Sequence, residues 1–359
     1  MAVMKRILGA TTALVVGTLS AQAGGIERTG FNPAFLFENG NYFEVAFGSV
    51  SPSVSGVAFG VSSGDMASSY NTISGSVKYQ LTDEFAIGVV VDQPVGVDVA
   101  YPGGTGYFFN TSSATVNSLQ LSVLGHYRFS PNVSAYAGVR AVRTDGIVDN
   151  VNLGIPTGGL PTYDMTTSTE VDYGYVVGVA YERPDIALRV ALSYISEVTH
   201  DFTATDSFGA GAGFATTIPQ GVNLDFQTGV AADTLVFGSI RWRDWSEFTI
   251  APRGTIALST NNKDTVSYSL GVGRKFSDTF SGLASVGYEP AGGGEVGNLG
   301  PTDGYRSLTL AGIYTAPTGM KVTVGASYGW VGDATTSGIG GRFTDNNFIG
   351  IGVRVGYSF

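Results

Sequence analysis

Alternation of apolar residues with small or polar residues is the feature that most limits how this chain can fold. The pattern has a period of two, runs over segments of about ten residues, and recurs almost to the C-terminus. In the last segment Ile349, Ile351 and Val353 share one face, whereas Gly352 and Arg354 share the other. Such a period predicts β-strands with an apolar face and a polar face.

Fourteen such segments can be counted. Their predicted bounds are 41–51, 70–81, 84–101, 114–129, 132–147, 169–182, 186–203, 216–230, 233–250, 263–276, 279–290, 303–315, 320–331 and 346–359. Short turns alternate with longer loops that are rich in Gly, Ser, Thr and Asn, an arrangement typical of membrane barrels. The expected fold is therefore all-β, a transmembrane antiparallel β-barrel of about 14 strands. Its longer loops, near 52–69, 148–168, 204–215 and 332–345, are expected to face the cell exterior.

The first residues predict an export signal. Lys5 and Arg6 precede a short apolar run, and Ala21-Gln22-Ala23 is a small-residue cleavage site. Beyond this run no apolar stretch reaches the roughly 20 residues that a membrane-spanning helix needs, so a barrel is the remaining way to span. The predicted division is a signal peptide at 1–23, a short N-terminal segment at 24–40 and a barrel at 41–359. The expected location is the outer membrane of a Gram-negative cell.

Charge and composition exclude several classes of partner. The net charge is −10, and cleavage would remove two basic residues and no acidic ones. This acidity argues against nucleic acid as a partner, because nucleic acid selects clustered Lys and Arg. The absence of Cys and the presence of two His predict no metal site, and nothing in the sequence predicts a cofactor. The expected partners are a hydrophobic ligand, lipid and lipopolysaccharide, and the barrel-assembly machinery during insertion.

Four short stretches, taken in order, resemble one family. They are Asn32-Pro33-Ala34 before the first strand, ALSYISEVTHDF from Ala191 to Phe202, Pro219 before the eighth strand, and Trp245-Ser246-Glu247-Phe248 at the end of the ninth. Together they resemble the FadL/TodX (OMPP1-like) outer-membrane transporters of long-chain fatty acids and hydrocarbons, over residues 32–359. The resemblance implies a fourteen-stranded barrel that passively transports long-chain fatty acids or other hydrophobic small molecules. It further implies capture among outer loops, a lumenal pocket, and lateral release beside a kinked third strand.

One departure from the family concerns the N-terminus. The family usually carries a plug of several dozen residues before the Asn-Pro-Ala motif, and here Gly24 to Phe31 form only a residual plug. Within the third strand, Asp92, Pro94 and Gly96 mark the expected kink and lateral opening. Pro94 lacks the N–H for a ladder bond and Gly96 lacks a side chain, so both weaken a strand interior. The alternative is a plain bulge that only tightens the curvature of the barrel.

Alternation of faces assigns charged residues to the lumen. A ligand carboxylate would suit the mid-barrel residues Arg140, Arg241 and Arg243, because a guanidinium binds carboxylates in bidentate fashion. The alternative is that these arginines form ion pairs within the barrel. The same alternation places Glu197 and Asp201 inward and His200 toward lipid. Five residues of the outer half are candidates for an apolar ligand lining or for loop packing: Phe108, Phe109, Leu160, Phe208 and Phe214.

An enzyme and a general diffusion porin are the two alternatives to a hydrophobic-ligand channel. An outer-membrane hydrolase needs a nucleophile beside a His near the rim, and neighbouring residues such as His200 and Asp201 face opposite sides of a strand. The sequence therefore predicts no enzymatic activity. A general diffusion porin is the nearer alternative, and the short plug favours it. Conductance in planar bilayers would separate a porin from a hydrophobic-ligand channel.

Overall fold

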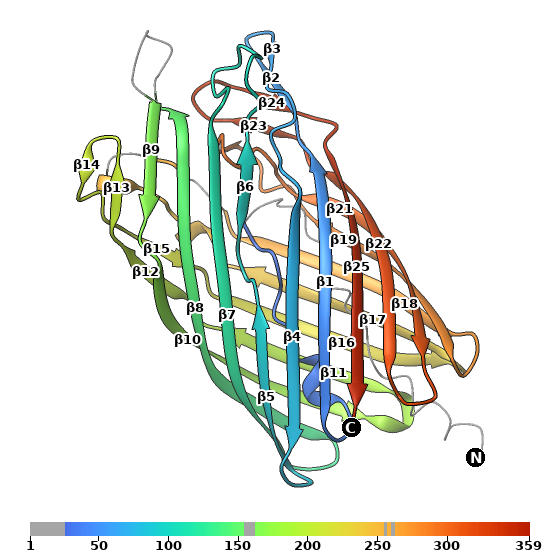
Figure 1. Cartoon of the computed structure of the whole chain (residues 1–359). Coiled ribbons are helices and arrows are strands. Elements are labelled where there is room, and N and C mark those ends of the chain that lie inside the picture. The colour runs from blue at the N-terminus through green and yellow to red at the C-terminus, as the bar shows by residue number, and fades with distance from the viewer. Residues whose placement is uncertain (1–25, 154–161, 255–256, 260–262) are drawn as a thin grey trace.

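The alternating segments form a closed antiparallel barrel of 14 strands (Figure 1). The computed structural model describes residues 26–153, 162–254, 257–259 and 263–359. The first strand pairs with the last along its whole length, with Tyr42 opposite Ser358 and Val45 opposite Val355. This pairing removes the free edges that an open sheet would expose. The predicted signal peptide and Leu160 lie outside the described residues.

Four of the barrel strands are interrupted, and each of these is written as two elements. In order around the barrel the strands are β1 (Tyr42–Ser53), β4 (Tyr70–Gln80), β5 (Phe85–Asp92) with β6 (Val97–Ala100), β7 (Ser113–Arg128), β8 (Val133–Asn152), β9 (Thr162–Thr167) with β10 (Glu170–Arg183), β11 (Leu188–Ile195) with β12 (Val198–Phe202), β15 (Phe214–Ile218) with β16 (Gly221–Ala231), β17 (Thr234–Arg243), β18 (Thr265–Lys275), β19 (Phe280–Glu289), β21 (Tyr305–Thr315), β22 (Lys321–Val331) and β25 (Asn347–Ser358).

Shorter elements lie in the N-terminal segment, in the loops and in one turn. They are η2 (Pro33–Phe37), β2 (Gly56–Ala58), β3 (Val61–Ser62), η3 (Pro184–Ile186), β13 (Ala204–Asp206), β14 (Gly209–Ala210), η4 (Trp245–Glu247), η5 (Pro252–Gly254), β20 (Glu295–Val296), β23 (Ala334–Thr336) and β24 (Arg342–Phe343). No helix in the described ranges combines the length and the apolar character that crossing a membrane requires.

The two faces of the strands differ as the alternation predicts. Leu310, Val324 and Ile351 point out of the barrel and are each more than half exposed, whereas Ser122 and Thr323 on the inner face are buried. A continuous apolar exterior with a polar interior is the reverse of a water-soluble sandwich, and it suits lipid on the outside. The prediction that the apolar faces look outward is confirmed.

One strand, formed by β11 and β12, changes its inward face at a point that the sequence pattern does not mark. Ile195 and Ser196 are both buried, so two successive residues face inward at the end of β11, as in a β-bulge. The alternation beyond this point is therefore reversed. His200 points inward and is fully buried, whereas Glu197 and Asp201 are exposed on the outer side. The predicted orientation of these three side chains was wrong for this reason.

The eighth and ninth strands also differ from their predicted bounds. Pro219 has no N–H to donate, and it separates β15 from β16. The ninth strand was predicted to run to residue 250, but β17 ends at Arg243 and the chain turns through η4. Both breaks lie toward the loop end of the barrel, where the wall bends around the cavity described below.

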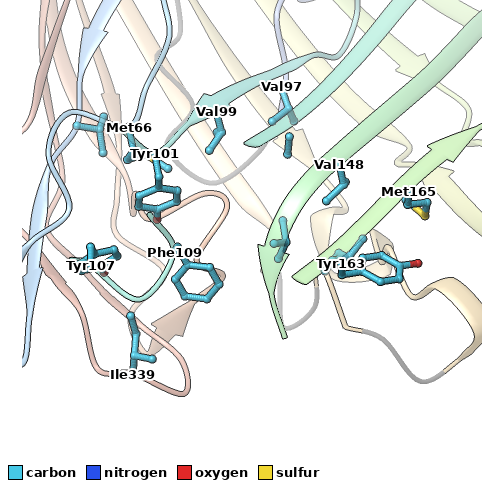
Figure 2. Packing of buried hydrophobic residues seen from close by; sticks show 14 of the residues in the cluster. Met66, Val97, Val99, Tyr101, Tyr107, Phe109, Val148, Tyr163, Met165 and Ile339 are labelled. Carbon is cyan, nitrogen blue, oxygen red and sulfur yellow. The ribbon is translucent and has the colours of Figure 1, made fainter. Parts of the chain in front are cut away.

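The outer loops have an apolar core of their own (Figure 2). Tyr101 stacks on Tyr107 with ring centroids 5.6 Å apart, and Phe109 lies 5.9 Å from Tyr101. Ile339, from the loop between β22 and β25, packs into the same cluster. This cluster joins loops that are far apart in the sequence, so the outer end of the barrel is capped by a packed structure.

A glycine in β22 offers a test of packing inside the wall. A Cβ at Gly329 would overlap Cε1 of Phe348, and Phe348 is fully buried. We expect Gly329→Ala to destabilise the barrel by about 1 to 3 kcal/mol, because overfilling a packed site forces strain on its neighbours. The midpoint temperature of heat-modifiable gel migration measures this. Gly297→Ala is the control, because nothing lies within 4 Å of a Cβ there; equal midpoints for the two variants would contradict the expectation.

Candidate functional site

A cavity of about 180 Å³ lies in the loop-end half of the barrel. It is bounded below by Ile26 of the N-terminal segment and Val95 of the third strand, and above by loop residues such as Leu299. Most of the other side chains that line it are apolar, among them Phe202, Phe214, Trp245, Phe248 and Leu258. An apolar cavity of about 150 Å³ is large enough to bind benzene. The cavity can therefore hold a molecule of about one aromatic ring.

Two aromatic residues reach the cavity because the ninth strand ends early. The turn of η4 brings Trp245 and Phe248 inward, where both are buried and their rings meet edge to face, with centroids 5.6 Å apart. Of the predicted apolar lining residues that the structure describes, only Phe214 lines this cavity. The sequence prediction extended the ninth strand through these residues and so missed them. The signal that could have found them was the aromatic pair Trp-x-x-Phe directly after a strand.

The third strand is interrupted where Pro94 and Gly96 lie. β5 ends at Asp92 and β6 begins at Val97, and residues 94 to 96 are buried in the interior. The N-terminal segment supplies the missing backbone partners from inside the barrel. Arg28 N–H donates to the Pro94 carbonyl (2.8 Å), Thr29 N–H to the Gln93 carbonyl (3.1 Å), and Gly96 N–H to the Ile26 carbonyl (2.8 Å). The N-terminal segment therefore holds the kinked stretch from the lumenal side, and Ser118 of β7 holds it from the wall by accepting from Val95 N–H (3.0 Å).

The wall has a gap in its backbone pairing beside this kink. β4 pairs with β5 only as far as Gly75 opposite Val91, and pairing resumes with the bridge between Ala67 and Val99. Between these points the described residues show no backbone ladder joining the second strand to the third. Ser68 N–H donates to the Asp98 carbonyl (3.1 Å) at the outer end of the interval, and Ile73 N–H donates to Gln93 Oε1 (3.0 Å) near the other end. We call this interval, residues 68–74 facing 92–98, the seam.

Arg28 fills the lumenal side of the seam. Its guanidinium lies 3.2 Å from the ring centroid of Tyr70 in β4 and pairs with Asp98 of β6 at 2.7 Å. It therefore joins the two strands that lack a ladder. Arg28 also lines two smaller cavities, of about 110 and 30 Å³.

The rest of the N-terminal segment packs deeper in the lumen. Asn32 caps η2 by accepting a hydrogen bond from Ala34 N–H (2.9 Å), and Pro33 sits at the first position of that helix, where its missing N–H costs nothing. Phe35 and Leu36 are buried against the barrel wall. The predicted Asn-Pro-Ala motif thus shapes a short plug that occupies the lumen.

The three predicted carboxylate-binding arginines lie away from the cavity lining. Arg140 donates to Gln120 Oε1 (3.0 Å) and to the Ser196 carbonyl (2.7 Å), and Gln120 in turn donates to Asp92 (3.1 Å). Arg243 pairs with Glu27 of the N-terminal segment at 3.0 Å. Arg241 lies against Gly30, where a Cβ would meet its Nη1 atom. All three support the plug or the wall in this structure, and their binding of a ligand carboxylate stays a prediction.

His200 ties three strands together at the wall of the cavity. Its Nδ1 atom lies 2.7 Å from Asp172 Oδ2 in β10, and its Nε2 atom lies 3.0 Å from Thr144 Oγ1 in β8. In the described residues β12 pairs with β15 and not with β10, so these side-chain bonds replace a backbone ladder. Both ring nitrogens are satisfied within the protein, as in a structural histidine.

The remaining predicted lining residues belong to the loops. Phe109 packs in the loop core of Figure 2 and meets Phe108 edge to face at 5.2 Å. Phe208 is 59% exposed and lies 6.2 Å from Tyr163. These three phenylalanines pack loop against loop here, which was the alternative left open by the sequence.

A family model described as "Outer membrane protein transport protein (OMPP1/FadL/TodX)" matches residues 44–338. That range covers most of the barrel, including the kink, the seam and the aromatic residues of η4. Comparison with the curated proteins gives no match.

Several solved structures have the same fold. A Pseudomonas aeruginosa FadL homologue superposes with a TM-score of 0.73 at 14% identity, covering 91% of this chain and 92% of that one. The Pseudomonas putida toluene transporter TodX gives 0.67 at 16% identity, with coverages of 94% and 96%. The Ralstonia pickettii toluene transporter TbuX gives 0.64 at 15% identity, with coverages of 96% and 98%. The barrel architecture is thus shared over nearly the full length of each chain.

Proposed function

Because the chain belongs to the OMPP1/FadL/TodX family of outer membrane transport proteins, we propose that it is a passive channel for hydrophobic small molecules. The single observation that carries this proposal is the apolar cavity between the outer loops and the plug. Its volume of about 180 Å³ suits a one-ring hydrocarbon better than an extended long-chain fatty acid. Two of the proteins with the same fold are described as toluene transporters, and toluene is a one-ring hydrocarbon of this size.

Flux of toluene into liposomes tests the proposal directly. Purified protein should accelerate toluene entry above the rate of protein-free liposomes, because the cavity provides an apolar binding site inside a polar lumen. The same preparation in planar bilayers should pass little ionic current, because the plug fills the lumen. Large steady currents without toluene flux would instead support the general diffusion porin.

We further propose that ligand leaves sideways through the seam. Three features support this route: the missing ladder between the second and third strands, the inward course of the kinked stretch, and the place of the Arg28 side chain on the lumenal side. A hydrophobic molecule that left through the wall would enter lipid directly and would avoid the charged residues nearer the strand ends. Lipid, lipopolysaccharide and the barrel-assembly machinery remain the expected partners of such a barrel.

Restoring the third strand should close this route. We expect Pro94→Val with Gly96→Thr to extend pairing across the kink and to lower toluene flux while the barrel stays folded, because the new residue at 94 supplies an N–H. A side chain at position 96 would also lie 2.8 Å from Arg28 Nε, so Pro94→Val alone is measured alongside. Pro131→Val, at an exposed turn, is the matched control. Undiminished flux in both kink variants would remove the seam from the mechanism.

A further inference from the structure

The cavity is apolar in its walls but acidic at its edges. Five carboxylate side chains line it against one lysine, and no arginine is among the described lining residues. The carboxylates are Asp145, Asp264, Glu289, Glu295 and Asp303. The lysine, Lys263, donates to the Gly292 carbonyl (3.0 Å). An anionic head group would therefore meet repulsion wherever it approached this edge.

Glu289 differs from the other cavity carboxylates because it is buried with one of its two oxygens unpartnered. It is the last residue of β19, it is 7% exposed, and its Oε1 atom has no hydrogen-bond partner in the described structure. The nearby carboxylates are satisfied: Asp303 accepts from Gly292 N–H (2.6 Å) and Gly293 N–H (2.8 Å), and Glu27 pairs with Arg243. Glu289 is thus an unused acceptor that faces the cavity.

A buried carboxylate without a partner is costly, and a ligand that donates to it recovers that cost. Three guanidinium groups of the lumen are directed elsewhere: Arg140 donates to Gln120 and Ser196, Arg243 pairs with Glu27, and Arg28 pairs with Asp98. A fourth, that of Arg241, lies against Gly30 of the N-terminal segment. The unsatisfied acceptor and the excess of negative charge both favour a positively charged donor on the ligand.

We propose that this cavity selects hydrophobic molecules that carry a cationic amine, with Glu289 accepting a charge-assisted hydrogen bond from the ammonium group. The apolar body of the ligand lies against Trp245, Phe248 and Phe202, and the head group points toward the end of β19. This inference rests on the proposed function and narrows it, because it names the head group that the cavity prefers. The expected order of binding affinity is amine, then alcohol, then carboxylate.

A matched series of one-ring ligands tests the order. Toluene, benzyl alcohol, benzylamine and benzoate share a ring and differ in the head group. Binding to the purified protein is read from the fluorescence of Trp245, which lines the cavity, in a Trp242→Phe, Trp330→Phe background that removes the other two of the three tryptophans. We expect benzylamine to bind about tenfold more tightly than benzyl alcohol, because a charged hydrogen bond is about twice as strong as a neutral one, and benzoate to bind most weakly.

Substitution of the acceptor gives the decisive comparison. Glu289→Gln keeps the shape and removes the charge, so it should weaken benzylamine binding about tenfold and leave toluene within about twofold. Glu295→Gln is the control, because Glu295 lines the same cavity but is exposed to solvent that screens its charge. Unchanged heat-modifiable migration shows that each variant is folded. Equal binding of amine and alcohol, tightest binding of benzoate, or equal effects of the two substitutions would overturn the inference.

The proposed function is judged separately by toluene flux in liposomes. If toluene flux is normal and the amine preference is absent, only this inference fails. If the amine preference is present and toluene flux is absent, the head-group site stands and the transport proposal fails.

Discussion

Locking the N-terminal segment to the kinked strand should reduce toluene flux to the rate of protein-free liposomes. The change is Glu27→Cys with Val95→Cys, two positions that face each other as an antiparallel bridge. Such partners have Cα atoms about 4.5 to 5.5 Å apart, within the range of a disulfide. The chain has no cysteine of its own, so the bond that forms is unambiguous.

The physical reason for this expectation lies in where the segment sits. Ile26 and Val95 both form the floor of the cavity, and Arg28 stands on the lumenal side of the seam. A molecule that moves from the cavity to the seam must therefore part the segment from the kinked strand. A covalent bond between the two forbids this, and adding a reductant should restore flux.

A second cross-link provides the control. Ala180 and Ala191 are buried partners in β10 and β11, within a stretch of regular pairing, so Ala180→Cys with Ala191→Cys should leave flux unchanged. Glu27→Cys alone controls for the loss of the pair with Arg243. Full flux through the oxidised 27–95 protein would show that ligand passes without displacing the segment.

Removing the side chain that fills the seam should have the opposite effect. Arg28→Ala is expected to raise the leak of small ions in planar bilayers well above that of the parent protein. Arg28 lines two cavities, so we expect its loss to join them, and the substitution also frees Asp98 and Tyr70 from their shared partner. The connected space reaches from the lumen beside β1 to the loop end near Met66.

Asp98→Asn separates two explanations for this leak. It removes the ion pair but leaves the guanidinium in place over Tyr70, so conductance should stay low if space filling keeps the seam closed. If Asp98→Asn leaks as much as Arg28→Ala, the charge pair is what closes the seam. Equal conductance of Arg28→Ala and the parent protein would contradict both explanations.

The architecture of this protein follows from the sequence alone because a strand has a side-chain period of two. The outward orientation of residues such as Ile351 and Val324 can be inferred from the alternation within their own strand, without knowing which strands pair with it. The interruption at Pro94 was equally visible, since a residue without an N–H cannot continue a ladder from either side. Strand count and the closed fold were therefore predicted correctly.

The orientation of His200 and the course of the chain after Arg243 depended on tertiary structure. A single bulge at Ile195 and Ser196 reverses the face of every residue that follows in the strand, and nothing in the local pattern marks that extra residue. The early end of β17 also depends on tertiary structure. The turn after Arg243 places Trp245 and Phe248 in the apolar cavity, where a straight continuation of the strand would not place them.

The sequence determined which residues could be charged inside the barrel, and the tertiary structure decided what each charge meets. Arg140, Arg241 and Arg243 were assigned correctly to the interior, but only the placement of the plug and of neighbouring strands shows that Gln120, Ser196, Gly30 and Glu27 lie against them. Glu289 gained its significance in the same way. In the sequence Glu289 looks like any other carboxylate. It becomes a candidate binding group only because folding buries it beside a cavity and leaves one of its oxygens without a donor. The free-energy cost of an unpaired charge depends on its surroundings in the fold and not on its neighbours in the chain.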